Sequence, residues 1–183
     1  MQAKSYPVGA VLVDPAGSIA YSGRNRAADE SAPPGRLVGT TLAHAELDVL
    51  GQLAPSEYDD WTLHTSLQPC LFCLSAIRLA RVGHVVYAGA DPVWDASARV
   101  PSILPAAISA RWPRSTGPAA GFDGVWGSLL PAMWLVVYQP ESVAEPSELM
   151  PWATVERARR CVAGGVLECG SMAEAYELAS SLS

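Results

Sequence analysis

The sequence has almost no lysine: Lys4 is the single lysine among 12 basic residues, against 18 acidic ones. The formal net charge is −6. Nucleic-acid-binding proteins normally present a basic face that supplies much of their affinity. The composition therefore argues against a nucleic-acid partner and favours a small-molecule one.

Long hydrophobic runs are also missing. No apolar stretch reaches the roughly 18 residues of a membrane span, and the first residues lack a signal-peptide pattern. With four cysteines in 183 residues, the chain does not resemble a secreted disulfide scaffold. The hydrophobic fraction of 50% fits a folded protein with a sizeable core. We therefore expect a cytoplasmic protein that binds no membrane.

Strand and helix patterns alternate along the chain, which predicts an α/β layered sheet. Thr40 or Thr41 is the expected N-cap of the first helix, and Gly83 the expected end of the second. Between 91 and 131 the pattern indicates loops and a short helix near 106–112. The predicted strands are 6–14, 18–25, 61–67, 84–91 and 132–138, and the predicted longer helices are 40–54, 70–83, 147–165 and 171–182.

Two cysteines three apart, in "LQPCLFC", open the second predicted helix. Positions i and i+3 share a helix face, so the sulfurs of Cys70 and Cys73 can reach one point. A helix N-terminus also favours the thiolate form. By itself this spacing fits a metal site, a redox pair or two structural cysteines.

A second short motif, His44-Ala45-Glu46, lies in the first predicted helix. His44, Cys70 and Cys73 would supply three zinc ligands, and a catalytic zinc keeps its fourth position open. Alone, His44 would be read as a core or surface histidine, and Glu46 as a solvated helix residue. Together with Pro69, however, they complete the pattern H-x-E followed by P-C-x-x-C, which is typical of zinc deaminases.

At these residues the chain resembles the cytidine-deaminase-like zinc-dependent deaminases. The segments "PVGAVLVD", "GRNR", "HAE", "LQPCLFCLSAI" and "VVYAGAD" occur in the family's order, over about half of the chain. The similarity is strongest to the branch of guanine, cytosine and tRNA adenosine deaminases. It implies a three-layer α/β/α fold with a central mixed sheet, and a dimer or larger oligomer, of which we expect the homodimer.

The resemblance also assigns roles to single residues. Asn25 of "GRNR" matches an asparagine that contacts substrate, although a turn role is the alternative. Gln68 stands where the branch usually has glutamate, which changes local hydrogen bonds but removes no zinc ligand. Trp94 is either a stacking surface for a flat base or an apolar lid or interface residue.

We therefore predict a zinc-dependent hydrolase that releases ammonia from a small nucleobase, a nucleoside or a related aminated heterocycle. His44, Cys70 and Cys73 would hold Zn²⁺, Glu46 would move protons, and Asn25 would bind substrate. The alternatives are a tRNA-editing adenosine deaminase and a non-catalytic, zinc-stabilised interaction module.

The sequence also predicts a boundary between residues 145 and 146, in the part of the chain that carries none of the family's motifs. Residues 1–145 would form the deaminase domain, and residues 146–183 a helical extension packed on it, since about forty residues rarely sustain their own core. Met172, Ala175, Tyr176 and Ala179 form the apolar stripe that would be buried.

Overall fold

A five-stranded sheet organises the protein in the computed structural model, which describes residues 4–148 and 150–182. Its strand order is β2-β1-β3-β4-β5. β1 pairs antiparallel with β2 and β3, whereas β3–β4 and β4–β5 are parallel, so the sheet is mixed. The strands are β1 (Gly9–Val13), β2 (Ile19–Arg24), β3 (Tyr58–Leu67), β4 (Val82–Gly89) and β5 (Arg114–Thr116). The predicted α/β fold with a central mixed sheet is confirmed.

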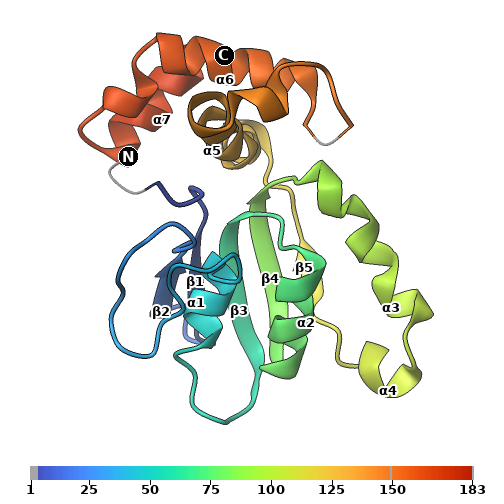
Figure 1. Cartoon of the computed structure of the whole chain (residues 1–183). Helices are drawn as coiled ribbons and strands as arrows, with labels where there is room; N and C mark the ends of the chain where they lie inside the picture. Colours follow the sequence, from blue (N-terminus) through green and yellow to red (C-terminus); the bar gives the residue numbers. More distant parts are fainter. Residues whose placement is uncertain (1–3, 149, 183) are drawn as a thin grey trace.

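In Figure 1, α1 and α2 lie in front of this sheet, and α5, α6 and α7 lie above its upper end. α1 and α2 pack on one face, over the buried side chains of Leu12, Leu63 and Val85. The longer helix α5 contacts β3 and β4, and α6 and α7 pack against it. The helices are α1 (Ala45–Leu50), α2 (Leu71–Leu79), α3 (Val100–Ile103), α4 (Ala106–Ser109), α5 (Gly121–Tyr138), α6 (Trp152–Ala163) and α7 (Met172–Ser181), with 3-10 segments at η1 (Pro92–Arg99), η2 (Pro140–Val143) and η3 (Val166–Glu168).

The strand predicted over 132–138 is wrong, because these residues form the second half of α5. The run "AMWLVVY" contains only apolar residues: Ala132 and Met133 are fully buried, whereas Val137 and Tyr138 at its end are 41% and 39% exposed. A short continuous apolar run has no period that would separate a buried strand from a buried helix. Pro131 inside the helix adds a misleading break in the sequence pattern.

Two predicted helix ends are also wrong. α1 begins at Ala45 after His44, not at Thr40 or Thr41, which lie in the preceding irregular segment. α2 ends at Leu79, and the chain turns at Arg81, whose φ is 61°. Arg81 forms ion pairs with Glu57 and Asp59 at that turn. Gly83 lies inside β4 instead.

α5 joins the C-terminal helices to the sheet through a close backbone contact. A Cβ on Gly127 would lie 2.3 Å from the amide nitrogen of Gly89 and 2.4 Å from the carbonyl oxygen of Ser66. Only glycine permits this approach. Farther along α5, Trp134 contacts Tyr6 edge-on with ring centroids 5.2 Å apart, and its indole nitrogen donates to the Lys4 carbonyl.

The C-terminal helices form a second hydrophobic cluster on α5. Ala158 and Cys161 of α6 and Ala175 and Ala179 of α7 are buried in it, whereas Met172 is 58% exposed. The predicted helices 147–165 and 171–182 thus correspond to α6 and α7. The division into 1–145 and 146–183 stays a prediction. Among the described residues, no helix is both long enough and apolar enough to cross a membrane.

Candidate metal centre and active site

Helix starts bring the three predicted metal ligands together. His44 is the residue before α1, and Cys70 is the residue before α2. Cys73 lies one turn into α2, and its amide donates to Cys70 Sγ at 3.4 Å. β3 ends at Leu67, three residues before Cys70, so the position of this strand in the sheet determines where α2 begins.

The three ligand atoms fit a zinc ion. Sγ of Cys70 lies 3.7 Å and Sγ of Cys73 3.4 Å from Nδ1 of His44. All three atoms lie within 4.8 Å of one another. In a tetrahedral site with Zn–S of about 2.3 Å and Zn–N of about 2.0 Å, ligand atoms are about 3.5–3.8 Å apart. The donor set and its spacing therefore suit Zn²⁺.

Glu46 lies beside this cluster and is 3% exposed. Its carboxylate accepts from Thr65 Oγ1 at 3.2 Å and from Cys73 Sγ at 3.4 Å. Burial raises the pKa of the Glu46 carboxyl above its usual range. The sequence singled out Glu46 but not Thr65, because an isolated threonine on a strand carries no motif.

The ligand side chains also shift one another's pKa. The hydrogen bond with Cys73 lowers the pKa of the Cys70 thiol to about 4, against burial and with a further contribution from His44. Hydrogen bonding to Cys70 and burial raise the pKa of the Cys73 thiol. The hydrogen bond between His44 and Cys70 raises the pKa of the His44 imidazole.

A cavity of about 360 Å³ opens onto these groups. Asn25 lines it and is 7% exposed, and its contact with a substrate stays a prediction. Asn25 Oδ1 accepts from the Ala27 amide at 2.9 Å, so the turn role holds. The other lining residues are Tyr6, Val8, Ala27, Thr41, His44, Ala45, Glu46, Leu67, Gln68, Cys70, Asp91 and Trp94. Tyr6 and Asp91 were not predicted to be at the site: Tyr6 precedes the first quoted segment, and Asp91 ends "VVYAGAD" without a role assigned to it.

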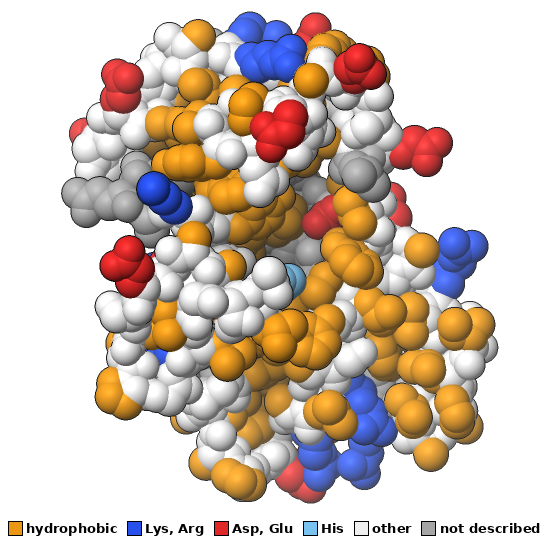
Figure 2. Space-filling view, in the orientation of Figure 1, with side chains coloured by type: hydrophobic (Ala, Val, Ile, Leu, Met, Phe, Trp, Pro, Cys, Tyr) orange, Lys and Arg blue, Asp and Glu red, His pale blue; other side chains and the backbone are white. Residues whose placement is uncertain are grey.

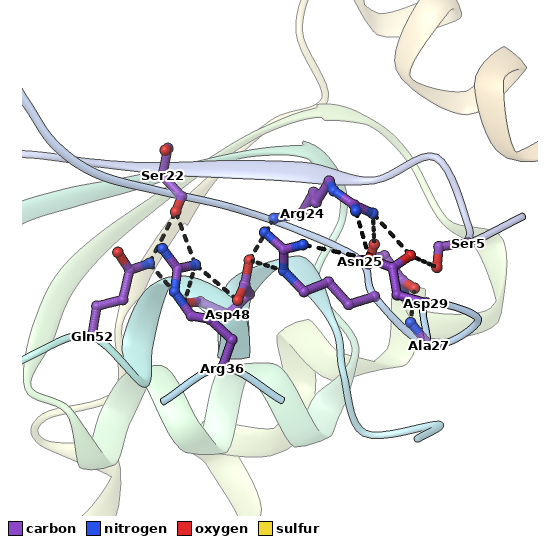
Figure 3. A network of polar contacts seen from close by, with 10 residues as sticks. Ser5, Ser22, Arg24, Asn25, Ala27, Asp29, Arg36, Asp48 and Gln52 are labelled. Carbon is purple, nitrogen blue, oxygen red and sulfur yellow. Dashed lines mark hydrogen bonds and ion pairs between the residues drawn. The ribbon is translucent and has the colours of Figure 1, made fainter. Parts of the chain in front are cut away.

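Charged side chains fix the end of β2, where Asn25 follows (Figure 3). Asp48 of α1 accepts from the Arg24 amide at 3.0 Å and from Arg26 Nε at 3.1 Å. Arg36 reaches the other Asp48 oxygen at 2.8 Å. The same helix therefore carries Glu46 into the site and holds the strand end that precedes Asn25.

The space-filling view shows this region from outside. Hydrophobic side chains gather along a hollow between the C-terminal helices and the sheet layer (Figure 2). Tyr6, Leu67 and Asp91 line both the cavity at Glu46 and a smaller cavity of about 90 Å³, which Met150 and Thr154 also line. The helical extension thus lies next to the candidate site.

Fold and site together define a mixed-sheet α/β protein with a His-Cys-Cys zinc site beside a buried glutamate. Residues 1–89 match the family described as "Cytidine and deoxycytidylate deaminase zinc-binding region". This part of the chain is therefore similar to the zinc-binding region of that family, and zinc is the metal that suits His44, Cys70 and Cys73.

Individual proteins are similar to parts of the chain. A tRNA(Ile)-lysidine synthase of Deinococcus radiodurans is 36% identical over 102 residues, which are 54% of this chain and 16% of that protein. A tRNA-specific adenosine deaminase of Streptococcus pyogenes is 32% identical over 95 residues, 50% of this chain and 54% of that protein. The chain thus spans no more than about half the length of these relatives.

A solved guanine deaminase of Bacillus subtilis is 28% identical, covers 62% of this chain and 69% of its own, and superposes with a TM-score of 0.40. At that TM-score the similarity carries no inference about this chain.

Proposed function

We propose that the protein is a zinc-dependent hydrolytic deaminase of a small nucleobase, nucleoside or related aminated heterocycle. The observation that carries this proposal is the buried Glu46 carboxylate, 3.4 Å from Cys73 Sγ and facing a cavity with room for a small ring. A purely structural zinc site has no use for such a carboxylate.

His44, Cys70 and Cys73 hold the metal in this proposal. When bound, zinc would lower the pKa of a coordinated water to about 7 and so supply a nucleophile at neutral pH. Glu46 accepts the proton that leaves the attacking water and passes it to the ring nitrogen beside the reacting carbon. It then helps to protonate the amine, which leaves as ammonia while the ring carbon keeps the water oxygen.

Other side chains orient the ring. Asn25, at the cavity wall, contacts the substrate through its amide. Thr65 donates to Glu46 Oε1 and fixes the carboxylate that moves the proton. Leu67 and Val8 give the cavity an apolar wall that excludes water.

An ammonia-release screen tests the proposal. Zinc-loaded protein is offered free bases, nucleosides and other aminated heterocycles, and Glu46→Gln serves as the control. We expect at least one compound to release ammonia with wild type and none at a comparable rate with the variant. Full zinc content without release from any compound would instead support the non-catalytic module.

A tRNA-editing adenosine deaminase is the second candidate, because relatives of that name share about 32% identity with the motif-bearing half of the chain. Arg24 donates to the Asn25 carbonyl oxygen at 3.0 Å, and Arg26 is the next residue in the sequence, so two basic residues flank Asn25. Incubation with tRNA and sequencing for adenosine-to-inosine conversion separates this candidate from the first.

We also propose a homodimer that uses the outer surface of α2 and α4. Arg78 of α2 donates to the carbonyl oxygens of Ala107 and Ile108, so the two helices are adjacent. Phe72 and Leu79 are 49% and 73% exposed there. Figure 2 shows hydrophobic side chains gathered over this side of the molecule. Exposed apolar patches of this kind commonly mark protein interfaces.

A cytoplasmic location completes the proposal. All four cysteines, Cys70, Cys73, Cys161 and Cys169, are free thiols in the structure. Free thiols are typical of the reducing cytosol.

A further inference from the structure

The candidate site contains a second carboxylate that the proposed proton transfers do not use. Asp91 follows β4 and lines the same cavity as Glu46. Within the described part of the chain, no lysine or arginine lines that cavity. The wall facing a substrate is therefore acidic, which is unfavourable for a substrate that carries a phosphate.

Asp91 is held in place by Gln68. The Asp91 amide donates to Gln68 Oε1 at 3.1 Å, and Gln68 Nε2 donates to the Trp94 carbonyl at 3.4 Å. Gln68 thus uses both ends of its amide to tie the start of η1 to the end of β3. A glutamate at this position could accept from Asp91 but could not donate to Trp94.

One Asp91 oxygen remains available to a ligand. Oδ1 accepts from the Val93 amide at 3.1 Å and caps η1. For the other oxygen, the described residues offer no hydrogen-bond donor within range. Tyr6 and Trp94 line the cavity with Asp91, and Tyr6 is anchored from α5 by Trp134. An aromatic ring with an N–H or O–H donor at its edge matches these three groups.

The nearby cations are already paired. Arg24 forms an ion pair with Asp29, and Arg26 pairs with both Asp29 and Asp48. Because these guanidinium groups serve the network of Figure 3, they do not compensate the two carboxylates in the cavity.

We infer that Asp91 is a specificity-determining residue that accepts a hydrogen bond from an uncharged base or nucleoside and disfavours the corresponding 5′-monophosphate. Gln68 is its positioning residue. The inference rests on the proposed deaminase activity and narrows it to uncharged substrates. The donor on the substrate is a ring N–H in a free base, or a ribose hydroxyl in a nucleoside.

The test uses three matched sets: cytosine, cytidine and CMP; adenine, adenosine and AMP; guanine, guanosine and GMP. Ammonia release by the zinc-loaded full chain gives kcat/KM for each compound. In parallel, calorimetric titration of Glu46→Gln protein measures binding without turnover. Within the reactive set, we expect the best uncharged member to exceed the monophosphate at least tenfold in both measurements.

Variants then assign the preference to Asp91. Asp91→Asn keeps an oxygen that can cap η1, so the segment should still fold. It should raise KM for the uncharged substrate about tenfold, leave kcat within about threefold, and narrow the preference over the monophosphate. Gln68→Glu should change KM in the same direction. Asp95→Asn is the control, since Asp95 is exposed and does not line the cavity.

The possible results distinguish a failure of the Asp91 inference from a failure of the proposed deaminase activity. Deamination that prefers the monophosphate, or a preference that Asp91→Asn leaves intact, overturns the inference while the deaminase activity stands. Absence of ammonia release from all nine compounds, with no binding to Glu46→Gln protein, counts against the small-substrate proposal itself and removes the inference with it.

Discussion

Replacing Asp48 by asparagine should destabilise the protein strongly. The Asp48 side chain is fully buried; it accepts from Arg26 Nε and the Arg24 amide and forms an ion pair with Arg36. Asparagine keeps the size but loses the charge, and it turns an NH2 group toward guanidinium donors. Arg36 would then lack its carboxylate partner, and Arg26 would keep only Asp29, in a largely buried setting.

The magnitude follows from this geometry. Removing one partner of a buried ion pair costs about 3–5 kcal/mol. The side chains of Arg26 and Arg36 retain 14% and 18% exposure, so water screens them in part. We therefore expect Asp48→Asn to lower the free energy of unfolding by about 3 kcal/mol, the lower end of this range. For a chain of this size, each kcal/mol lowers Tm by about 2–4 °C, which gives a loss of about 6–12 °C.

The effect should also depend on pH. Burial opposes ionisation of Asp48, but the bonds from Arg36, the Arg24 amide and Arg26 outweigh it and lower the pKa of this carboxyl. A carboxyl with a lowered folded pKa stabilises the protein above its unfolded pKa of about 3.9 and loses this contribution as pH falls through the folded value. The difference between wild type and Asp48→Asn should therefore shrink in acid.

Urea unfolding of both proteins at pH 7 and at pH 3 measures the difference. Asp59→Asn is the matched control, because Asp59 also pairs with an arginine but its side chain is 51% exposed. An exposed pair contributes at most about 1 kcal/mol. If Asp48→Asn costs no more than Asp59→Asn at neutral pH, the network does not hold α1 to β2 as argued.

Three further perturbations test other parts of the structure. Gly127→Ala should cost about 1–3 kcal/mol in thermal unfolding, because its Cβ would clash with the backbone of Gly89; Gly9→Ala, with its nearest atom at 3.8 Å, should be nearly neutral, and equal effects would refute close packing of α5. Cys73→Ser should lower zinc from one equivalent per chain to well below it, and unchanged metal content would remove Cys73 from the ligand set. Phe72→Glu should convert the proposed homodimer to a monomer in light scattering, whereas an unchanged mass would place the interface elsewhere.

The site was more predictable from sequence than the fold around it. His44, Glu46, Cys70 and Cys73 belong to two short motifs, and each motif lies where a helix begins. Local spacing placed Cys70 with Cys73 and His44 with Glu46, whereas the combined pattern typical of zinc deaminases joined the two motifs. Asp91 and Tyr6 line the same cavity, but no metal or catalytic spacing marked either of them in the sequence.

The C-terminal half was predicted less well for a related reason. The middle of helix α5, from Leu129 to Met133, is buried, and its apolar residues continue to the exposed end of the helix without alternating with polar ones. The run 132–138 consequently resembled a strand. Residues 92–109 form three short helical segments with few buried side chains, and such segments have too few turns to show a helical period.

The proton-transfer role of Glu46 is the central claim, and its most direct test is to measure zinc content and turnover on the same samples of wild type and Glu46→Gln. Our account predicts one zinc per chain in both proteins and ammonia release about 10²–10⁴-fold slower in the variant, the usual contribution of a general acid–base group. A Glu46→Gln protein with full zinc that releases ammonia at the wild-type rate would contradict it.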